Sequence, residues 1–220
     1  MRVGADVPKQ FLMFAGKTVL EHSVEVFESY PRIDEIAIVV REDYIPDVEA
    51  FVEKNQWKKV KHILKGGKER YDSSLAAVAI YEDDDNLLLH DAVRPLLTHR
   101  ILDDCIESLK YYNAIDVGVM MRDTIIQVNA DRCIDYVPPR HLLRSGQTPQ
   151  CFKRKTLRQA YEIALRDPAF VTTDDCGTVV RYLPNEKVYV VEGDVSNMKL
   201  TFKEDLPIIE KMYWERMKSE

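Results

Sequence analysis

The sequence predicts an α/β domain, built on a mostly parallel, twisted sheet with helices on both faces. Short β-rich runs alternate with longer amphipathic segments along most of the chain, an order typical of this class. The run Ile36–Val40 is continuous and largely β-branched, which indicates a parallel strand buried on both faces. The length of 220 residues suits a single domain.

The expected elements follow in chain order. Residues 18–30 carry apolar side chains at helical spacing, and the segment 46–55 begins with a proline at a favoured first helical position. Residues 70–81 are rich in alanine and indicate a helix, and Leu87–Leu89 is the most apolar of the expected strands. The other expected helices span residues 99–112, 153–166 and 205–217, and the other expected strands span residues 60–64, 116–121 and 188–191.

Residues 123–150 depart from this alternation. Residues 124–128 and 133–137 alternate apolar and polar side chains on either side of a turn, which is the pattern of a β-hairpin. A hairpin of this length does not fold back easily into a parallel sheet, so we expect a projecting β-arm. Arms of this kind can dock on a second copy, and we therefore expect a two-fold homodimer. A long surface flap is the alternative.

Composition disfavours several classes of partner. The chain has 31 Lys and Arg against 37 Asp and Glu, a net charge of −6, so a broad basic surface for nucleic acid is not expected. No window approaches 18 consecutive apolar residues, so no membrane span is expected, and the N-terminus lacks a signal-peptide pattern. The cysteines form no CxxC pair and suggest a reducing cytoplasm; they are Cys105, Cys133, Cys151 and Cys176.

Candidate ligand-binding residues follow several strands, where open parallel sheets bind their ligands. Gly66–Gly67 would let the backbone approach a ligand next to a helix N-terminus, although an ordinary connection is the alternative. Asp91 and Arg94 follow the most apolar strand and could hold Mg²⁺ and a phosphate, or could form a simple ion pair. Lys9 and Lys199 are mobile charges suited to phosphates, or ordinary solvated lysines.

Taken together, these motifs resemble the cytidylyltransferases of the methylerythritol-phosphate and ribitol-phosphate type. Seven motifs run in the family's order across nearly the whole chain: Arg2-Val3-Gly4 with Pro8-Lys9-Gln10-Phe11, Gly66-Gly67 with Arg70 and Ser73, His90-Asp91-Ala92-Val93-Arg94-Pro95, Asp123-Thr124, Gln147-Thr148-Pro149-Gln150, Thr173-Asp174-Asp175, and Asn197-Met198-Lys199-Leu200-Thr201. The resemblance implies a Rossmann-like nucleotidyltransferase fold with a β-arm that crosses into a dimer partner. It also implies that CTP and a polyol phosphate give a CDP-polyol and pyrophosphate, with Mg²⁺.

The resemblance implies roles for residues at the triphosphate. Arg2 and Lys9 would hold the triphosphate of CTP. Lys199 would stabilise negative charge at the α-phosphate, and Asp91 would help to hold Mg²⁺. There is little covalent chemistry for a protein to supply in such a transfer, so catalysis would consist of positioning and charge neutralisation.

It also implies how the base would be recognised. Gly67, the backbone at Lys68, and Ser73 would read the cytosine, while Arg70 would brace their loop.

The polyol phosphate would be held by residues of two subunits. Arg94 and Thr173 would contact the polyol, and Thr124 and Arg140 from the neighbouring arm would grip its phosphate. Methylerythritol-phosphate enzymes usually carry an acid where this chain has Ser196. That difference favours the ribitol-phosphate branch, with D-ribitol 5-phosphate as substrate and a cell-surface polymer as the destination of the product. 2-C-methyl-D-erythritol 4-phosphate, a precursor in isoprenoid synthesis, is the alternative.

One departure from the family pattern bears on activity. The family's first strand and glycine-rich phosphate loop precede the position of Arg2, and residues 1–220 contain neither. The start could be incomplete or the loop truly absent, and either case predicts a gap or an unpaired edge in the sheet. Two other functions therefore stay open: a nucleotide- or polyol-phosphate-binding protein with impaired catalysis, and a uridylyl- or other sugar-nucleotide transferase of the same fold.

Overall fold

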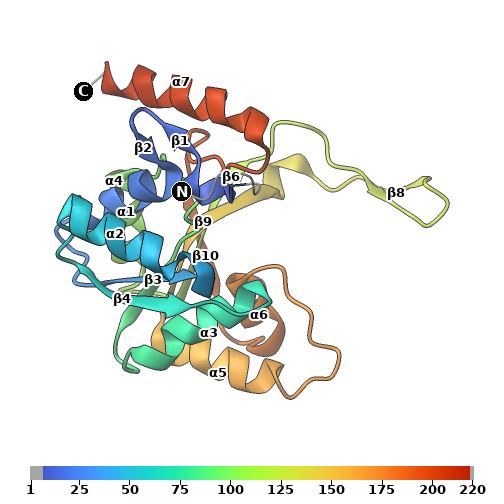
Figure 1. The fold of residues 1–220 in the computed structure, drawn as a ribbon. Helices are drawn as coiled ribbons and strands as arrows, with labels where there is room; N and C mark the ends of the chain where they lie inside the picture. The colour runs from blue at the N-terminus through green and yellow to red at the C-terminus, as the bar shows by residue number, and fades with distance from the viewer. Residues whose placement is uncertain (1–6, 219–220) are drawn as a thin grey trace.

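The computed structural model describes residues 7–218, which form an α/β fold (Figure 1). Its helices pack around two sheets, each of which contains a pair of parallel strands. The larger sheet has the order β10-β6-β9-β5. Its strands are β5 (Asn86–Leu89), β6 (Ala114–Met120), β9 (Arg144–Lys153) and β10 (Val188–Glu192). β6 and β10 are parallel, whereas β9 is antiparallel to both of its neighbours, so this sheet is mixed.

A second sheet consists of β3 (Ile36–Val40) and β4 (Val60–Lys65), which pair in parallel. β3 and β5 both line a cleft of about 870 Å³, together with side chains of α1 and α3. Within residues 7–218, β3 pairs with β4 alone and β5 with β9 alone, so each strand turns an unpaired edge toward this cleft. Among the described residues, no backbone ladder therefore joins the β3–β4 sheet to the larger sheet.

The helices largely follow the predicted segments. They are α1 (Val19–Ser29), α2 (Ile45–Asn55), α3 (Arg70–Ile80), α4 (His99–Ser108), α5 (Arg154–Ala164), α6 (Asp175–Tyr182) and α7 (Leu206–Met217). α1 begins with a capping box in which the Thr18 hydroxyl and the Glu21 carboxylate each accept a backbone N–H. α6 is short and was not predicted; the Asp174 side chain caps it by accepting the Gly177 N–H at 2.6 Å.

A small hairpin that the sequence pattern did not indicate precedes α1. It joins β1 (Met13–Phe14) to β2 (Lys17–Thr18) through Ala15 and Gly16, both of which have positive φ angles. Phe14 stacks on His22 of α1, with ring centroids 4.0 Å apart.

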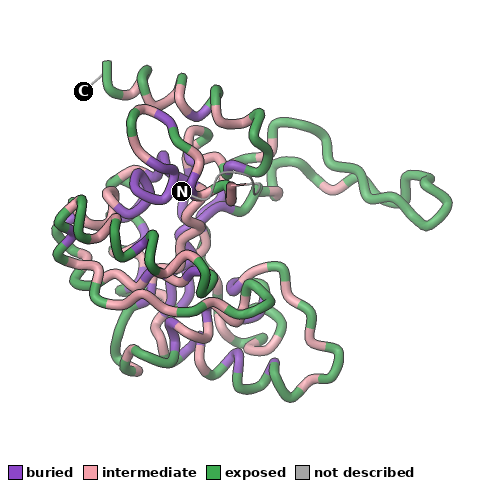
Figure 2. The backbone as a smooth tube through the Cα atoms, viewed as in Figure 1, coloured by how far each residue is buried: buried purple, intermediate pink, exposed green. Residues whose placement is uncertain are grey.

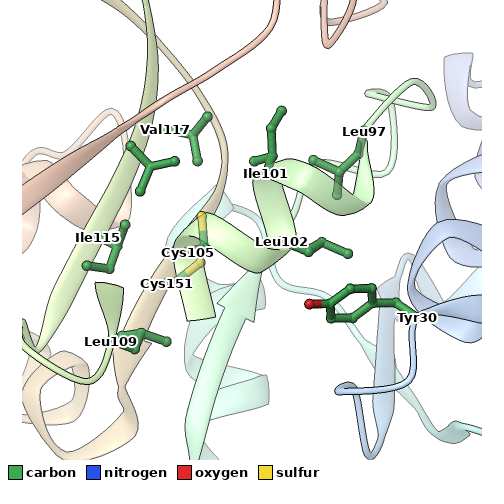
Figure 3. Packing of buried hydrophobic residues seen from close by; sticks show 10 residues of the cluster. Tyr30, Leu97, Ile101, Leu102, Cys105, Leu109, Ile115, Val117 and Cys151 are labelled. Carbon is green, nitrogen blue, oxygen red and sulfur yellow. The ribbon is translucent and has the colours of Figure 1, made fainter. Parts of the chain in front are cut away.

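The largest core cluster lies between α4 and the strands β6 and β9 (Figure 3). Ile101, Leu102 and Cys105 of α4 are fully buried; Cys105 lies next to Cys151 of β9, whereas Leu102 points toward Tyr30. A separate cluster packs α1 and α2 against β3 and β4, around Val48 and Trp57. All four cysteines are free, and Cys105, Cys151 and Cys176 are buried, which fits packing better than chemistry.

The predicted arm projects from the body as a hairpin of β7 (Gln127–Val128) and β8 (Ile134–Tyr136), and its length is exposed (Figures 1 and 2). Its predicted end at residue 150 is wrong, because residues 144–153 form strand β9, which is buried from Gln147 to Phe152. The polar Gln147 and Gln150 disguised that strand in the sequence. Within the described part of the chain, no helix is long and apolar enough to cross a membrane.

Candidate active site

Three cationic side chains converge on the carboxylate of Asp91, just beyond the end of β5. Lys199 donates a hydrogen bond from Nζ to Oδ2 at 2.8 Å. The Nε atoms of Arg70 and Arg94 lie 3.9 and 3.7 Å from the same carboxylate. The loop that follows β10 supplies Lys199, the start of α3 supplies Arg70, and the β5 loop supplies Arg94. The fold thus places four residues that the sequence predicted for the site in one cluster.

The ionisation of Asp91 follows from this setting. Its burial alone would raise its pKa, but the hydrogen bond and charge of Lys199, with the charges of Arg70 and Arg94, more than offset that effect and lower the pKa. Asp91 is therefore a carboxylate at neutral pH. Burial lowers the pKa of Arg94, an effect that the charge of Asp91 opposes.

The backbone of Asp91 is held by residues that the sequence did not single out for this role. Its N–H donates to the Thr148 hydroxyl at 3.1 Å, and that hydroxyl lies 3.0 Å from Nδ1 of His90. The other ring nitrogen of His90 lies 3.0 Å from the Arg94 carbonyl. Burial lowers the pKa of His90 to about 4, so the neutral imidazole donates from Nε2 to this carbonyl and accepts the hydroxyl proton of Thr148 at Nδ1.

The glycine loop lies at the ends of β3 and β4. Gly66 donates its N–H to the Val40 carbonyl at 2.8 Å, which fixes the loop to β3. A Cβ atom at Gly67 would lie 2.3 Å from the Asp72 side chain, so this position requires glycine. Gly67 and Ser73 line the same cleft as Asp91, whereas Lys68 is an exposed residue of the loop.

Arg94 is buried in a network that ties the Lys199 loop to β9. Its guanidinium donates to the Asn197 carbonyl at 2.9 Å and to the Gly146 carbonyl at 3.4 Å. The Asn197 amide donates to Thr148 O at 2.8 Å and contacts Gln147 Oε1 at 3.3 Å. Arg94 Nε and Asn197 Oδ1 are buried without a hydrogen-bond partner, which leaves one donor and one acceptor of this network unsatisfied.

The remaining predicted residues lie at the margins of this cluster. Lys9 begins a short 3₁₀ turn, Lys9–Phe11, and its ammonium donates to the Thr201 carbonyl, which places it next to the Lys199 loop. Thr173 is exposed in the loop before α6. Arg2 lies outside the described residues.

The arm residues are not part of the Asp91 cluster of the same chain. Thr124 is exposed near the root of the arm, and Arg140 donates to the Arg122 carbonyl at 3.0 Å. Arg140 and Arg122 line a second cavity of about 620 Å³ with Asp194, where β6, the arm and the β10 loop meet.

The donor set at Asp91 fits a magnesium ion that takes most of its ligands from substrate. The described residues hold no group of three or more acidic, histidine or cysteine side chains suited to a metal. Mg²⁺ is commonly bound by one or two carboxylates together with water and substrate phosphates. Asp91 would supply the one carboxylate, and the triphosphate of a bound nucleotide would supply the phosphate ligands.

A glycine loop, a carboxylate and several cations at the carboxyl ends of parallel strands are the features by which α/β folds bind nucleotide phosphates. They define this chain as a nucleotide-binding α/β protein. A family model described as "IspD: 2-C-methyl-D-erythritol 4-phosphate cytidylyltransferase" matches residues 1–215. The chain belongs to this family.

Individual relatives agree with the family but carry different names. The chain is 41% identical over 218 residues to 2-C-methyl-D-erythritol 4-phosphate cytidylyltransferase of Thermobifida fusca (strain YX), covering 96% of this chain and 88% of that protein. It is 43% identical over 219 residues to the bifunctional ribulose 5-phosphate reductase/CDP-ribitol pyrophosphorylase Bcs1 of Haemophilus influenzae, covering 98% of this chain but only 46% of that longer protein.

Solved structures share the fold. The crystal structure of 4-diphosphocytidyl-2C-methyl-D-erythritol synthase from Anaerococcus prevotii DSM 20548 superposes with a TM-score of 0.85 at 27% identity, covering 93% of each chain. The structure of 2-C-methyl-D-erythritol 4-phosphate cytidylyltransferase from Thermus thermophilus gives a TM-score of 0.75 at 25% identity, again covering 93% of each chain.

Proposed function

We propose that this chain transfers a cytidylyl group from CTP to a polyol phosphate and releases pyrophosphate. A phosphate oxygen of the polyol phosphate attacks the α-phosphorus of CTP. The bond from that phosphorus to the oxygen bridging to the β-phosphate breaks, and pyrophosphate leaves with the electron pair. The observation that carries the proposal is the convergence of Lys199, Arg70 and Arg94 on Asp91 at the mouth of the glycine-loop cleft.

Each group has a task that its position supports. Lys199 would neutralise charge that develops at the α-phosphate, and Lys9, beside the same loop, would hold the β- and γ-phosphates with Arg2. Asp91 would hold Mg²⁺, which when bound neutralises the triphosphate. Gly67, the Lys68 backbone and Ser73 would contact the base, with the loop braced by Arg70. In this way the chain orients two anionic substrates and offsets their repulsion.

We propose D-ribitol 5-phosphate as the polyol phosphate, with the product serving a cell-surface polymer. Ser196 supports this choice because it stands where methylerythritol-phosphate enzymes usually carry an acid. Its hydroxyl donates to Asp194 Oδ1 and accepts from Arg216, at 2.7 and 2.8 Å, so it is fully engaged within the protein. The similarity to the CDP-ribitol pyrophosphorylase also supports it. The similarity to methylerythritol-phosphate enzymes favours the alternative substrate, which belongs to isoprenoid synthesis.

We also propose that a homodimer completes the site through the arm. The apolar side chains of Ile126, Val128, Ile134 and Tyr136 are at least half exposed along it, which is unusual for an unpartnered hairpin. Thr124 and Arg140 of a second copy would then bind the substrate phosphate, while Arg94 and Thr173 of the first contact its polyol. Because all four cysteines are free thiols, the cytoplasm is the proposed compartment.

Within residues 7–218, the edges of β3 and β5 that do not pair with β4 and β9 belong to strands that line the cleft proposed to bind CTP. A nucleotide- or polyol-phosphate-binding protein with impaired catalysis is the alternative function. Pyrophosphate release should be measured with CTP and with UTP, against ribitol 5-phosphate and methylerythritol phosphate, with and without Mg²⁺. Release that needs CTP, ribitol 5-phosphate and Mg²⁺ supports the proposal. CTP binding without release supports the alternative, and preference for UTP contradicts the choice of nucleotide.

A further inference from the structure

Asp175 is a fully buried carboxylate at the start of α6, and both of its oxygens are hydrogen-bonded. The guanidinium of Arg70 donates to Oδ2 and the hydroxyl of Tyr161 donates to Oδ1, each at 2.5 Å. The Asp175 N–H donates to Oε1 of Gln150 at 3.1 Å, which fixes the backbone to β9. A buried carboxylate whose two oxygens each accept a hydrogen bond allows little freedom to the groups that bind it.

Arg70 is the group through which Asp175 reaches the site. It is the first residue of α3, directly after the glycine loop, and its Nε lies 3.9 Å from Asp91. Its guanidinium thus spans two carboxylates, one buried and one at the mouth of the cleft. Burial and the charge of Asp175 raise the pKa of Tyr161, so its hydroxyl stays protonated and keeps its donor role.

We propose that Asp175 is a positioning residue, which aims the Arg70 guanidinium at Asp91 and thereby sets the glycine loop that receives CTP. The inference rests on the proposed function, in which Arg70 braces the nucleotide loop. Asp175 also lies two residues after Thr173, the proposed polyol contact. The Asp175 carboxylate therefore connects the Thr173 segment, proposed to contact the polyol phosphate, to the glycine loop, proposed to bind CTP.

The chain offers a matched control for removal of this charge. Asp167, in the loop between α5 and α6, also binds a tyrosine and an arginine: the Tyr182 hydroxyl at 2.7 Å and Arg181 at 3.1 Å. Asp167 and its partners Arg181 and Tyr182 line neither of the two cavities described above, whereas Arg70, the partner of Asp175, lines the larger one. Asp175→Asn and Asp167→Asn therefore remove the same charge from the same kinds of partner, once beside the site and once away from it.

The test measures CTP affinity by calorimetry and steady-state KM and kcat on protein whose folding is checked by circular dichroism. Folded Asp175→Asn should bind CTP at least fivefold more weakly and raise KM for CTP by a similar factor, and Asp175→Glu should recover part of the loss. Asp167→Asn should leave both values within twofold of wild type. A purely structural role would lower the active fraction, and with it the apparent kcat, without changing KM.

Tyr161→Phe keeps the carboxylate and frees one of its oxygens, so it tests the proposal if Asp175→Asn does not fold. It should weaken CTP binding at least twofold. The inference would be overturned if the folded Asp175 and Tyr161 variants kept the wild-type affinity for CTP. It would also be overturned if Asp167→Asn weakened CTP binding as much as Asp175→Asn does. Wild-type protein that binds CTP but forms no CDP-polyol contradicts the proposed function alone, whereas wild-type protein that does not bind CTP contradicts both.

Discussion

The ammonium group of Lys199 lies 2.8 Å from a carboxylate oxygen of Asp91, a residue 108 positions earlier in the chain. The pair joins the loop after β10 to the end of β5. It keeps a cation that would stabilise the transition state next to the carboxylate that would hold the metal. When the triphosphate of CTP binds beside Asp91, Lys199 would exchange one anionic partner, the Asp91 carboxylate, for another, the α-phosphate. The lysine therefore needs little rearrangement to neutralise charge at the α-phosphate.

Replacing Lys199 by alanine should lower kcat at least 100-fold, equivalent to about 2.7 kcal/mol of transition-state stabilisation. The loss follows from removal of a fixed positive charge at the α-phosphate. Pyrophosphate release measures it. Lys211→Ala, which removes an exposed lysine on α7, is the matched control and should leave the rate unchanged. A decrease of less than fivefold for Lys199→Ala would mean that this lysine has another role.

Gly67→Ala should impair CTP binding because the added Cβ would lie 2.3 Å from the Asp72 side chain. Asp72 accepts the Glu69 N–H at 2.9 Å and so shapes the same loop, which must move to relieve the clash. We expect KM for CTP to rise about tenfold, with a much smaller change in KM for the polyol phosphate. Equal increases for both substrates would show that the loop does not discriminate between them.

If the arm acts across a dimer, two inactive variants should complement each other. Arg140→Ala removes the residue supplied by the arm, and Lys9→Ala removes a residue of the receiving site. Equimolar mixing after subunit exchange should restore about a quarter of wild-type activity, because half of the dimers then contain one intact site of two. Failure to recover activity, with dimers verified by light scattering, would place both residues in a site within one chain.

Acid stability should depend on Glu21, whose side chain is fully buried under α2. Burial alone would raise its pKa, but hydrogen bonds from Asn55, the Thr18 backbone and Lys54 outweigh it and lower the pKa to about 2. Since the folded pKa lies below the unfolded value of 4.5, the stabilisation is complete above about pH 4.5 and is lost as pH falls toward 2. Its full size is about 3 kcal/mol.

Urea unfolding at pH 6 and at pH 3 measures this dependence. Glu21→Gln should reduce the free energy of unfolding at pH 6 and flatten its decline between the two pH values. Glu49→Gln, at an exposed position of α2, is the control and should keep the wild-type slope. An unchanged slope in Glu21→Gln would show that other carboxylates govern acid unfolding.

Periodic apolar residues were sufficient to predict most strands and helices. The apolar positions of α4 and α5 recur on one buried face, and β3 is a run of apolar residues of which Ile38 and Val40 are buried. β9 escaped prediction because Gln147 and Gln150 are polar side chains buried by hydrogen bonds to partners remote in sequence. The Asp91 region could be predicted from its position after an apolar strand. The positioning role proposed for Asp175 could not be predicted from the sequence, because it depends on contact with Arg70, which lies 105 residues away in the chain.

The facing edges of β3 and β5 have a consequence for how the molecule opens. No ladder of backbone hydrogen bonds connects the two sheets within residues 7–218, and β3 and β4 share a separate apolar cluster with α1 and α2. The β3–β4 unit should therefore behave as its own cooperative folding unit. Amide hydrogen exchange should show β3 and β4 exchanging together and sooner than β6 and β9, so that the β3 side of the cleft loosens before the rest of the protein unfolds.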